Sequence, residues 1–113
     1  MLEMREVSMA EFEKARTAGA VVIDVGDVEE YDRGHIPGAA SLPLGDLSRD
    51  LSVARCQIRR DAPVYVVCAA GNRSLIAAGM LMHAGYDAFS VRGGTGAWVK
   101  AGNAVVGGDH VRY

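Results

Sequence analysis

Hydrophobic residues along the chain gather in three short, mostly apolar runs. These runs are Ala20–Val25, Val64–Cys68 and Tyr86–Val91, and they contain most of the β-branched and aromatic residues of the central part of the sequence. The first two are rich in Val. A short apolar run of this kind is typical of a strand that is buried on both faces of a parallel sheet. The pattern therefore predicts three central strands.

The segments between these runs carry the signals of helices. Ser8 with Glu11, and Asp27 with Glu30, have the spacing of a capping box, in which two side chains satisfy free amides at a helix start. We expect helices over residues 9–18, 27–33, 43–54 and 73–84, and a last short helix around Trp98. Alternating strands and helices predict an α/β domain with a mostly parallel central sheet and helices on both faces.

The length and composition are those of one domain. With 113 residues, of which 50% are hydrophobic, the chain can bury one core. We expect a single domain over residues 1–113, with its core at about 4–102 and a C-terminal extension at 103–113. The sequence leaves the oligomeric state open.

Charge and cysteine content exclude several classes of function. A net charge of -2 offers no cationic surface for nucleic acid or for an anionic membrane. The first six residues include two glutamates, which is not typical of a signal peptide, so we expect a cytoplasmic protein. Two cysteines are too few for a disulfide framework or a zinc site, and we expect no metal and no cofactor.

Cys68 stands where chemistry is expected in such a fold, because ligands of open parallel sheets bind beyond the carboxyl ends of strands. In the loop that follows, Gly71 permits a positive φ, and the backbone amides of Ala69 to Ser74 can turn inward as an anion nest. A helix start and the Arg73 guanidinium add positive charge. A free thiol with a pKa near ~8.5 is only ~3% ionised at pH 7, and lowering that pKa by about two units would make the thiolate the major form. We therefore predict that Cys68 is a nucleophile.

The loop from Cys68 to Ser74 resembles the C-x-x-G-x-R-S active-site loop of the rhodanese family. Three further segments agree with that family in order and spacing, namely Ile23-Asp24-Val25 leading to Glu30-Tyr31, the stretch Gly34-His35-Ile36-Pro37-Gly38-Ala39, and Gly93-Gly94 with Ala97-Trp98. The resemblance covers nearly the whole chain and implies a single rhodanese-like domain.

The resemblance also implies a sulfurtransferase reaction. Cys68 would accept a sulfane sulfur as a persulfide, from a small sulfur-containing anion such as thiosulfate or from a protein persulfide, and pass it to cyanide or a thiol. Arg73 would act with Cys68 by orienting the donor. The substrate would be bound by the loop residues Ala69, Ala70, Gly71, Asn72 and Ser74.

Two departures from the family pattern keep other functions open. Gly26 stands where the family commonly has an arginine, and Ala69 and Ala70 replace charged or polar residues of other members. These departures allow a sulfur carrier or a protein-docking module without turnover. A Cys-dependent phosphatase or arsenate reductase is disfavoured, because the related enzymes of those classes have one more residue between the Cys and the Arg than the four found here.

Four other residues have two interpretations each. Asp24 is expected to support the loop through hydrogen bonds rather than act as a base, and His35 to stabilise a turn rather than assist the cysteine. Cys56 has no nest beside it and is expected to be a passive thiol, with resolution of the Cys68 persulfide as the alternative. Arg92 can either reach the anion site or lie in solvent.

Overall fold

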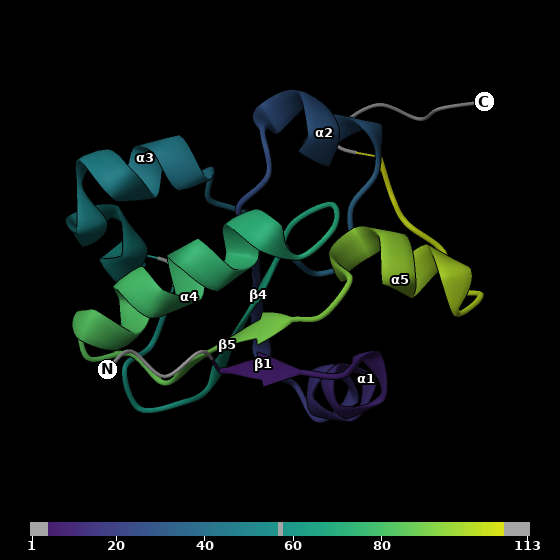
Figure 1. Ribbon diagram of the computed structural model, residues 1–113, viewed down its shortest axis with the longest axis horizontal. Coiled ribbons are helices and arrows are strands. Elements are labelled where there is room, and N and C mark those ends of the chain that lie inside the picture. Colours follow the sequence, from purple (N-terminus) through teal and green to yellow (C-terminus); the bar gives the residue numbers. More distant parts are fainter. Residues whose placement is uncertain (1–4, 57, 108–113) are drawn as a thin grey trace.

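A five-stranded parallel sheet forms the centre of the computed structural model, which describes residues 5–56 and 58–107 (Figure 1). The strands lie in the order β1-β5-β4-β2-β3, and every neighbouring pair is parallel. Their bounds are β1 Glu6–Val7, β2 Val21–Asp24, β3 Ala40–Ser41, β4 Val64–Val67 and β5 Ala88–Val91. The predicted α/β class and parallel sheet are confirmed.

The three predicted strands are the three central ones, each somewhat shorter than its apolar run. Strands β1 and β3 are not predicted from the sequence. Each has only two residues and lies at an edge of the sheet, so neither needs a continuous apolar run.

Side chains of the strands alternate between the two faces of the sheet, and each face has its own hydrophobic cluster. On one face, Ile23 and Val66 pack with Leu47 and Leu81, which belong to the helices of that side. On the other face the fully buried Phe12 meets Trp98 edge to face, with ring centroids 6.0 Å apart. The predicted covering of both faces by helices is therefore confirmed.

The helices supply one layer to each face. Helices α3 and α4 and the 3₁₀-helix η1 cover one face, whereas α1 and α5 cover the other, and no residue of α2 is fully buried. Their bounds are α1 Met9–Thr17, α2 Val28–Arg33, α3 Leu44–Arg49, η1 Leu51–Cys56, α4 Asn72–His83 and α5 Gly94–Lys100. None of the helices within the described ranges is long and apolar enough to cross a membrane.

The single helix expected over residues 43–54 is wrong. Helix α3 ends at Arg49, and Asp50 adopts an extended backbone with φ -154°. The Asp50 carboxylate accepts a hydrogen bond of 3.0 Å from the Ser52 amide, which starts η1 as a separate turn. Asp and Ser compete with helical hydrogen bonds in this way, so an apolar pattern that continues past them does not guarantee one helix.

The described part of the expected C-terminal extension, residues 103–107, lies against the domain. Val106 forms an antiparallel bridge with His35, and the Trp98 indole donates a hydrogen bond of 2.8 Å to the Ala104 carbonyl. Residues 108–113 are outside the described residues. The domain bounds remain a prediction.

Candidate active site

Cys68 follows directly on β4, at the edge of the sheet where the parallel strands end. Its side chain is 1% exposed. The chain then turns through Ala69 and Ala70 to Gly71, which precedes α4 with a left-handed φ of +100°. A Cβ at Gly71 would lie 3.0 Å from the Gly93 amide nitrogen, so both the backbone conformation and the close approach favour glycine. The turn therefore brings the chain back over the sulfur.

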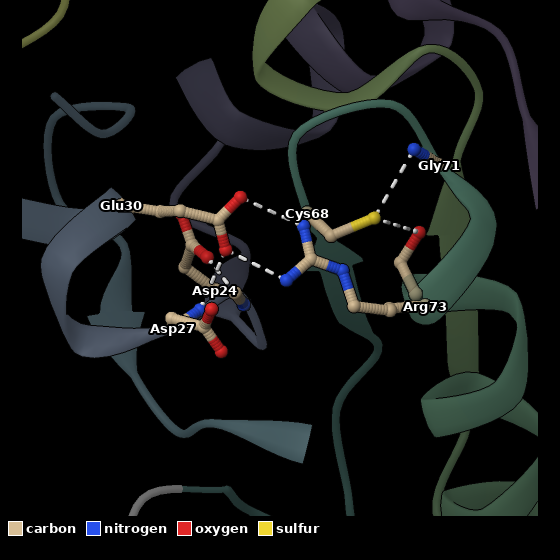
Figure 2. A network of polar contacts seen from close by, with 8 residues as sticks. Asp24, Asp27, Glu30, Cys68, Gly71 and Arg73 are labelled. Carbon is tan, nitrogen blue, oxygen red and sulfur yellow. Dashed lines mark hydrogen bonds and ion pairs between the residues drawn. The ribbon is translucent and has the colours of Figure 1, made fainter. Parts of the chain in front are cut away.

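The loop provides hydrogen bonds to the sulfur (Figure 2). The Gly71 amide donates to Sγ of Cys68 over 3.1 Å, and the Ser74 Oγ lies 3.6 Å from the same sulfur. The hydroxyl of Ser74 is 2.7 Å from that of Ser90, and both serines are fully buried. A thiolate can only accept, so with an ionised sulfur the Ser74 hydroxyl donates to it and Ser90 can donate to Ser74.

These contacts decide the ionisation of Cys68. Burial raises the pKa of the thiol, because a charge is poorly solvated there. The Ser74 hydroxyl and the amides of Ser74, Gly71 and Ala70 oppose burial, and together they outweigh it. The pKa of Cys68 is consequently lowered from its ordinary value, the direction expected of a nucleophilic cysteine.

Helix α5 donates hydrogen bonds to two backbone carbonyls of the loop, those of Cys68 and Ala69. The Thr95 amide donates to the Cys68 carbonyl over 2.9 Å, and the Gly96 amide to the Ala69 carbonyl over 3.0 Å. Gly94 lies so close that a Cβ there would clash with the Cys68 carbonyl oxygen. The sequence points to this contact only through the pair Gly93-Gly94, whose partner it does not reveal.

Arg73 forms an ion pair with Glu30 that is not predicted from the sequence. Its two terminal nitrogens lie 2.6 and 3.0 Å from the two carboxylate oxygens of Glu30, in a bidentate arrangement that joins α4 to α2 (Figure 2). The Arg73 hydrogen bonds, followed by the Asp27 amide, lower the pKa of Glu30 to about 2, and Glu30 raises the pKa of Arg73. In the sequence, Glu30 is distinguished only by its capping-box spacing from Asp27 and its place beside Tyr31, and neither feature indicates a contact with Arg73.

Asp24 ends β2 at the same edge and is 4% exposed. Its carboxylate accepts a hydrogen bond of 2.8 Å from the Gly26 amide. Burial raises the pKa of this carboxyl, and the Gly26 amide opposes that effect. A Cβ at Gly26 would lie 3.0 Å from Oδ1 of Asp24 and 3.1 Å from Oε1 of Glu30, so a larger residue there would press on both carboxylates.

The remaining candidates lie apart from the sulfur or on its rim. His35 is buried, donates from Nδ1 to the Tyr31 carbonyl over 2.8 Å and stacks on the Tyr31 ring. Arg92 is exposed and pairs with Glu6 of β1 at 3.1 Å. Asn72 is an exposed first residue of α4. The Cys56 side chain is outside the described residues, so its two interpretations stay predictions.

A pocket of about 300 Å³ opens beside the loop. Its wall is formed by Asp24, Glu30, Arg33, Gly34, Ala69 and Thr95. Ala69 and Ala70 are both exposed and present only methyl groups. A small sulfur compound can therefore approach the loop without displacing a large side chain.

Comparison with known proteins agrees with this geometry. The family model described as "Rhodanese-like domain" matches residues 8–101. The chain belongs to the rhodanese-like family. The resemblance seen in the sequence is thereby confirmed.

Two similar proteins match this rhodanese-like domain over most of its length and of their own. It is 35% identical over 102 residues to the thiosulfate sulfurtransferase GlpE of Pseudomonas entomophila, with 87% of each chain covered. A rhodanese-related protein from Thermoplasma volcanium superposes with a TM-score of 0.79 at 29% identity, covering 90% of this chain and 97% of that one. YrkF of Bacillus subtilis, whose name marks it as a candidate sulfur carrier, is 31% identical over 65 residues, covering 58% of this chain and 33% of YrkF. The relatives' names thus point to sulfurtransferase chemistry in general.

Proposed function

We propose that this rhodanese-like domain is a sulfurtransferase that carries sulfane sulfur as a persulfide on Cys68. The observation that supports it best is the Gly71 amide hydrogen bond to Sγ at 3.1 Å, joined by the Ser74 hydroxyl. These donors favour a thiolate, and the same donors can stabilise the negative charge of a persulfide. Arg73 is the charged residue proposed to help hold the donor, and Asp24 and His35 support the surrounding turns.

The reaction consists of two displacements at sulfur. In the first, the Cys68 thiolate attacks the outer sulfur of the donor, the donor S–S bond breaks, and the leaving group departs with the electron pair. That leaving group is sulfite when the donor is thiosulfate and a thiolate when the donor is a persulfide. In the second, a thiol or cyanide attacks the outer sulfur of the Cys68 persulfide, and the Cys68 thiolate is regenerated. Neither step consumes a cofactor.

Mass spectrometry tests the intermediate directly. After incubation of reduced protein with thiosulfate or a persulfide donor, we expect a gain of one sulfur, about 32 Da, on the peptide that contains Cys68. The Cys68→Ser variant should lose the gain and all turnover while keeping its circular dichroism spectrum. Cys56→Ser is the matched control and should retain both. Folded wild-type protein that stays unmodified at Cys68 with every donor would contradict the proposal.

A sulfur carrier without small-molecule turnover is the second candidate. The uncharged surface of Ala69 and Ala70 favours it, and the relative YrkF carries such a name. Rapid turnover of thiosulfate and cyanide by the isolated protein would exclude it. In both cases a reducing compartment keeps the thiol free, so we propose a cytoplasmic location.

A further inference from the structure

The cation closest to the reactive loop is already matched by an anion. Both terminal nitrogens of Arg73 face the Glu30 carboxylate at 2.6 and 3.0 Å, and this pair is about one-third exposed. A guanidinium held in this way keeps free N–H groups, but its charge is offset at contact distance. The field that an incoming anion meets is thereby reduced.

Other charges around the pocket do not restore a positive field. The pocket wall carries Asp24, Glu30 and Arg33, and Arg73 adjoins Glu30. Asp27 also acts on Arg73, so three carboxylates stand against two guanidinium groups, and Arg33 is exposed, where solvent screens it. Gly26, Ala69 and Ala70 contribute no charge at all. The charged side chains around the pocket therefore give it no net positive charge.

We propose that Glu30 sets the donor specificity of this site by offsetting Arg73, so that singly charged persulfides are accepted in preference to dianionic donors such as thiosulfate. This inference rests on the proposed sulfurtransferase function. Glu30 acts through Arg73 and is a specificity-determining residue without contact to the reacting atoms.

The total negative charge of the reactants in the loading of Cys68 differs between the two donors. With thiosulfate, the Cys68 thiolate and the dianion bring three negative charges together, the S–S bond breaks, and dianionic sulfite leaves with the electron pair. With cysteine persulfide, a new S–S bond forms between Sγ and the outer sulfur, and the cysteine thiolate leaves with the electron pair. At most two net negative charges meet in that case. A site without net positive charge therefore disfavours the first reaction more strongly.

The test compares Glu30→Gln with Glu29→Gln. Glutamine keeps the shape and a hydrogen-bond acceptor at position 30 but releases the Arg73 charge, whereas Glu29 is exposed on the same helix and its variant removes an equal charge. Second-order rate constants for sulfur loading of Cys68 are measured by mass spectrometry with thiosulfate and with cysteine persulfide. Comparing variants for each donor cancels the donors' intrinsic reactivities.

We expect Glu30→Gln to raise the thiosulfate rate constant about tenfold, equivalent to ~1.4 kcal/mol, and to change the cysteine persulfide rate constant less than about twofold. Glu29→Gln should leave both within about twofold. Equal changes for the two donors, or a loss with thiosulfate, would show that Glu30 only positions the loop and would overturn the inference.

A measurement on wild-type protein decides the matter if Glu30→Gln does not fold. Raising the ionic strength from about 0.01 to 1 M shortens the screening length from about 30 to 3 Å. A pocket without net positive side-chain charge predicts that thiosulfate loading does not slow by more than about twofold, and a steep decrease would show that the site attracts anions by net positive charge and would overturn the inference. If neither donor loads Cys68 under any condition, the sulfurtransferase function itself is wrong and the inference falls with it.

Discussion

We expect the Glu30–Arg73 ion pair to stabilise the fold, and both the size of this contribution to the unfolding free energy and its pH dependence follow from the structure. The pair links α2 to α4 across 43 positions of sequence, beside the reactive loop. A Glu30 pKa lowered from 4.5 to about 2 corresponds to folding free energy on the order of 3 kcal/mol before solvent screening is counted. The two side chains are 30% and 34% exposed, so solvent weakens the pair, and we expect Glu30→Gln to cost about 1–2 kcal/mol at pH 7.

The pH dependence follows from the direction of the shift. The pKa of Glu30 is lower in the folded than in the unfolded protein. The stabilisation that its ion pair gives the fold is therefore fully present above about pH 4.5 and is lost as the pH falls toward 2. The difference in unfolding free energy between wild type and Glu30→Gln should therefore be largest near pH 7 and shrink below about pH 4.5.

Urea unfolding at pH 7, 4.5 and 3, followed by circular dichroism, measures this difference. The exposed neighbour Glu29 supplies the matched variant, Glu29→Gln, which should change stability by less than about 0.5 kcal/mol throughout. A Glu30→Gln difference that is the same at pH 7 and pH 3 would refute an electrostatic origin and indicate lost packing instead.

Further variants test the loop around the sulfur. Ser74→Ala should raise the pKa of Cys68, seen as a higher midpoint in the pH profile of its alkylation rate, and Ser90→Ala should act in the same direction but less strongly. An alkylation midpoint that is unmoved in both would show that the hydroxyl pair does not stabilise the thiolate. Gly94→Ala should lower the unfolding free energy by about 2 kcal/mol or more, because its Cβ would clash with the Cys68 carbonyl. Its control, Gly79→Ala in the middle of α4, meets nothing within 4 Å and should gain about 0.5–1 kcal/mol; equal effects in urea unfolding would contradict the close contact.

Features that depend on local pattern could be predicted from the sequence. The apolar runs identify the three central strands, and the glycine at position 71 predicts the positive φ with which the loop turns over the sulfur. The break at Asp50 is harder, because a side-chain hydrogen bond over two residues decides it while the apolar pattern continues.

Features that depend on distant partners could not be predicted. The Ser74–Ser90 hydroxyl pair joins positions 16 apart, and Glu30 meets Arg73 only because β2 and β4 are neighbours in the sheet. A single sequence contains no record of such pairings. The identity of Cys68 as a candidate nucleophile was accessible from its own neighbours, but the groups that tune and surround it were not.

The hydrogen bonds from α5 to the reactive loop join segments that are far apart in the sequence. Two of the loop carbonyls find their donors on Thr95 and Gly96, in the last helix of the described fold. During synthesis Cys68 is therefore made well before the residues that complete its surroundings. A chain that ends before residue 93 would keep the Gly71 and Ser74 donors to the sulfur but would lack the Thr95 and Gly96 amides that hold the carbonyls of Cys68 and Ala69.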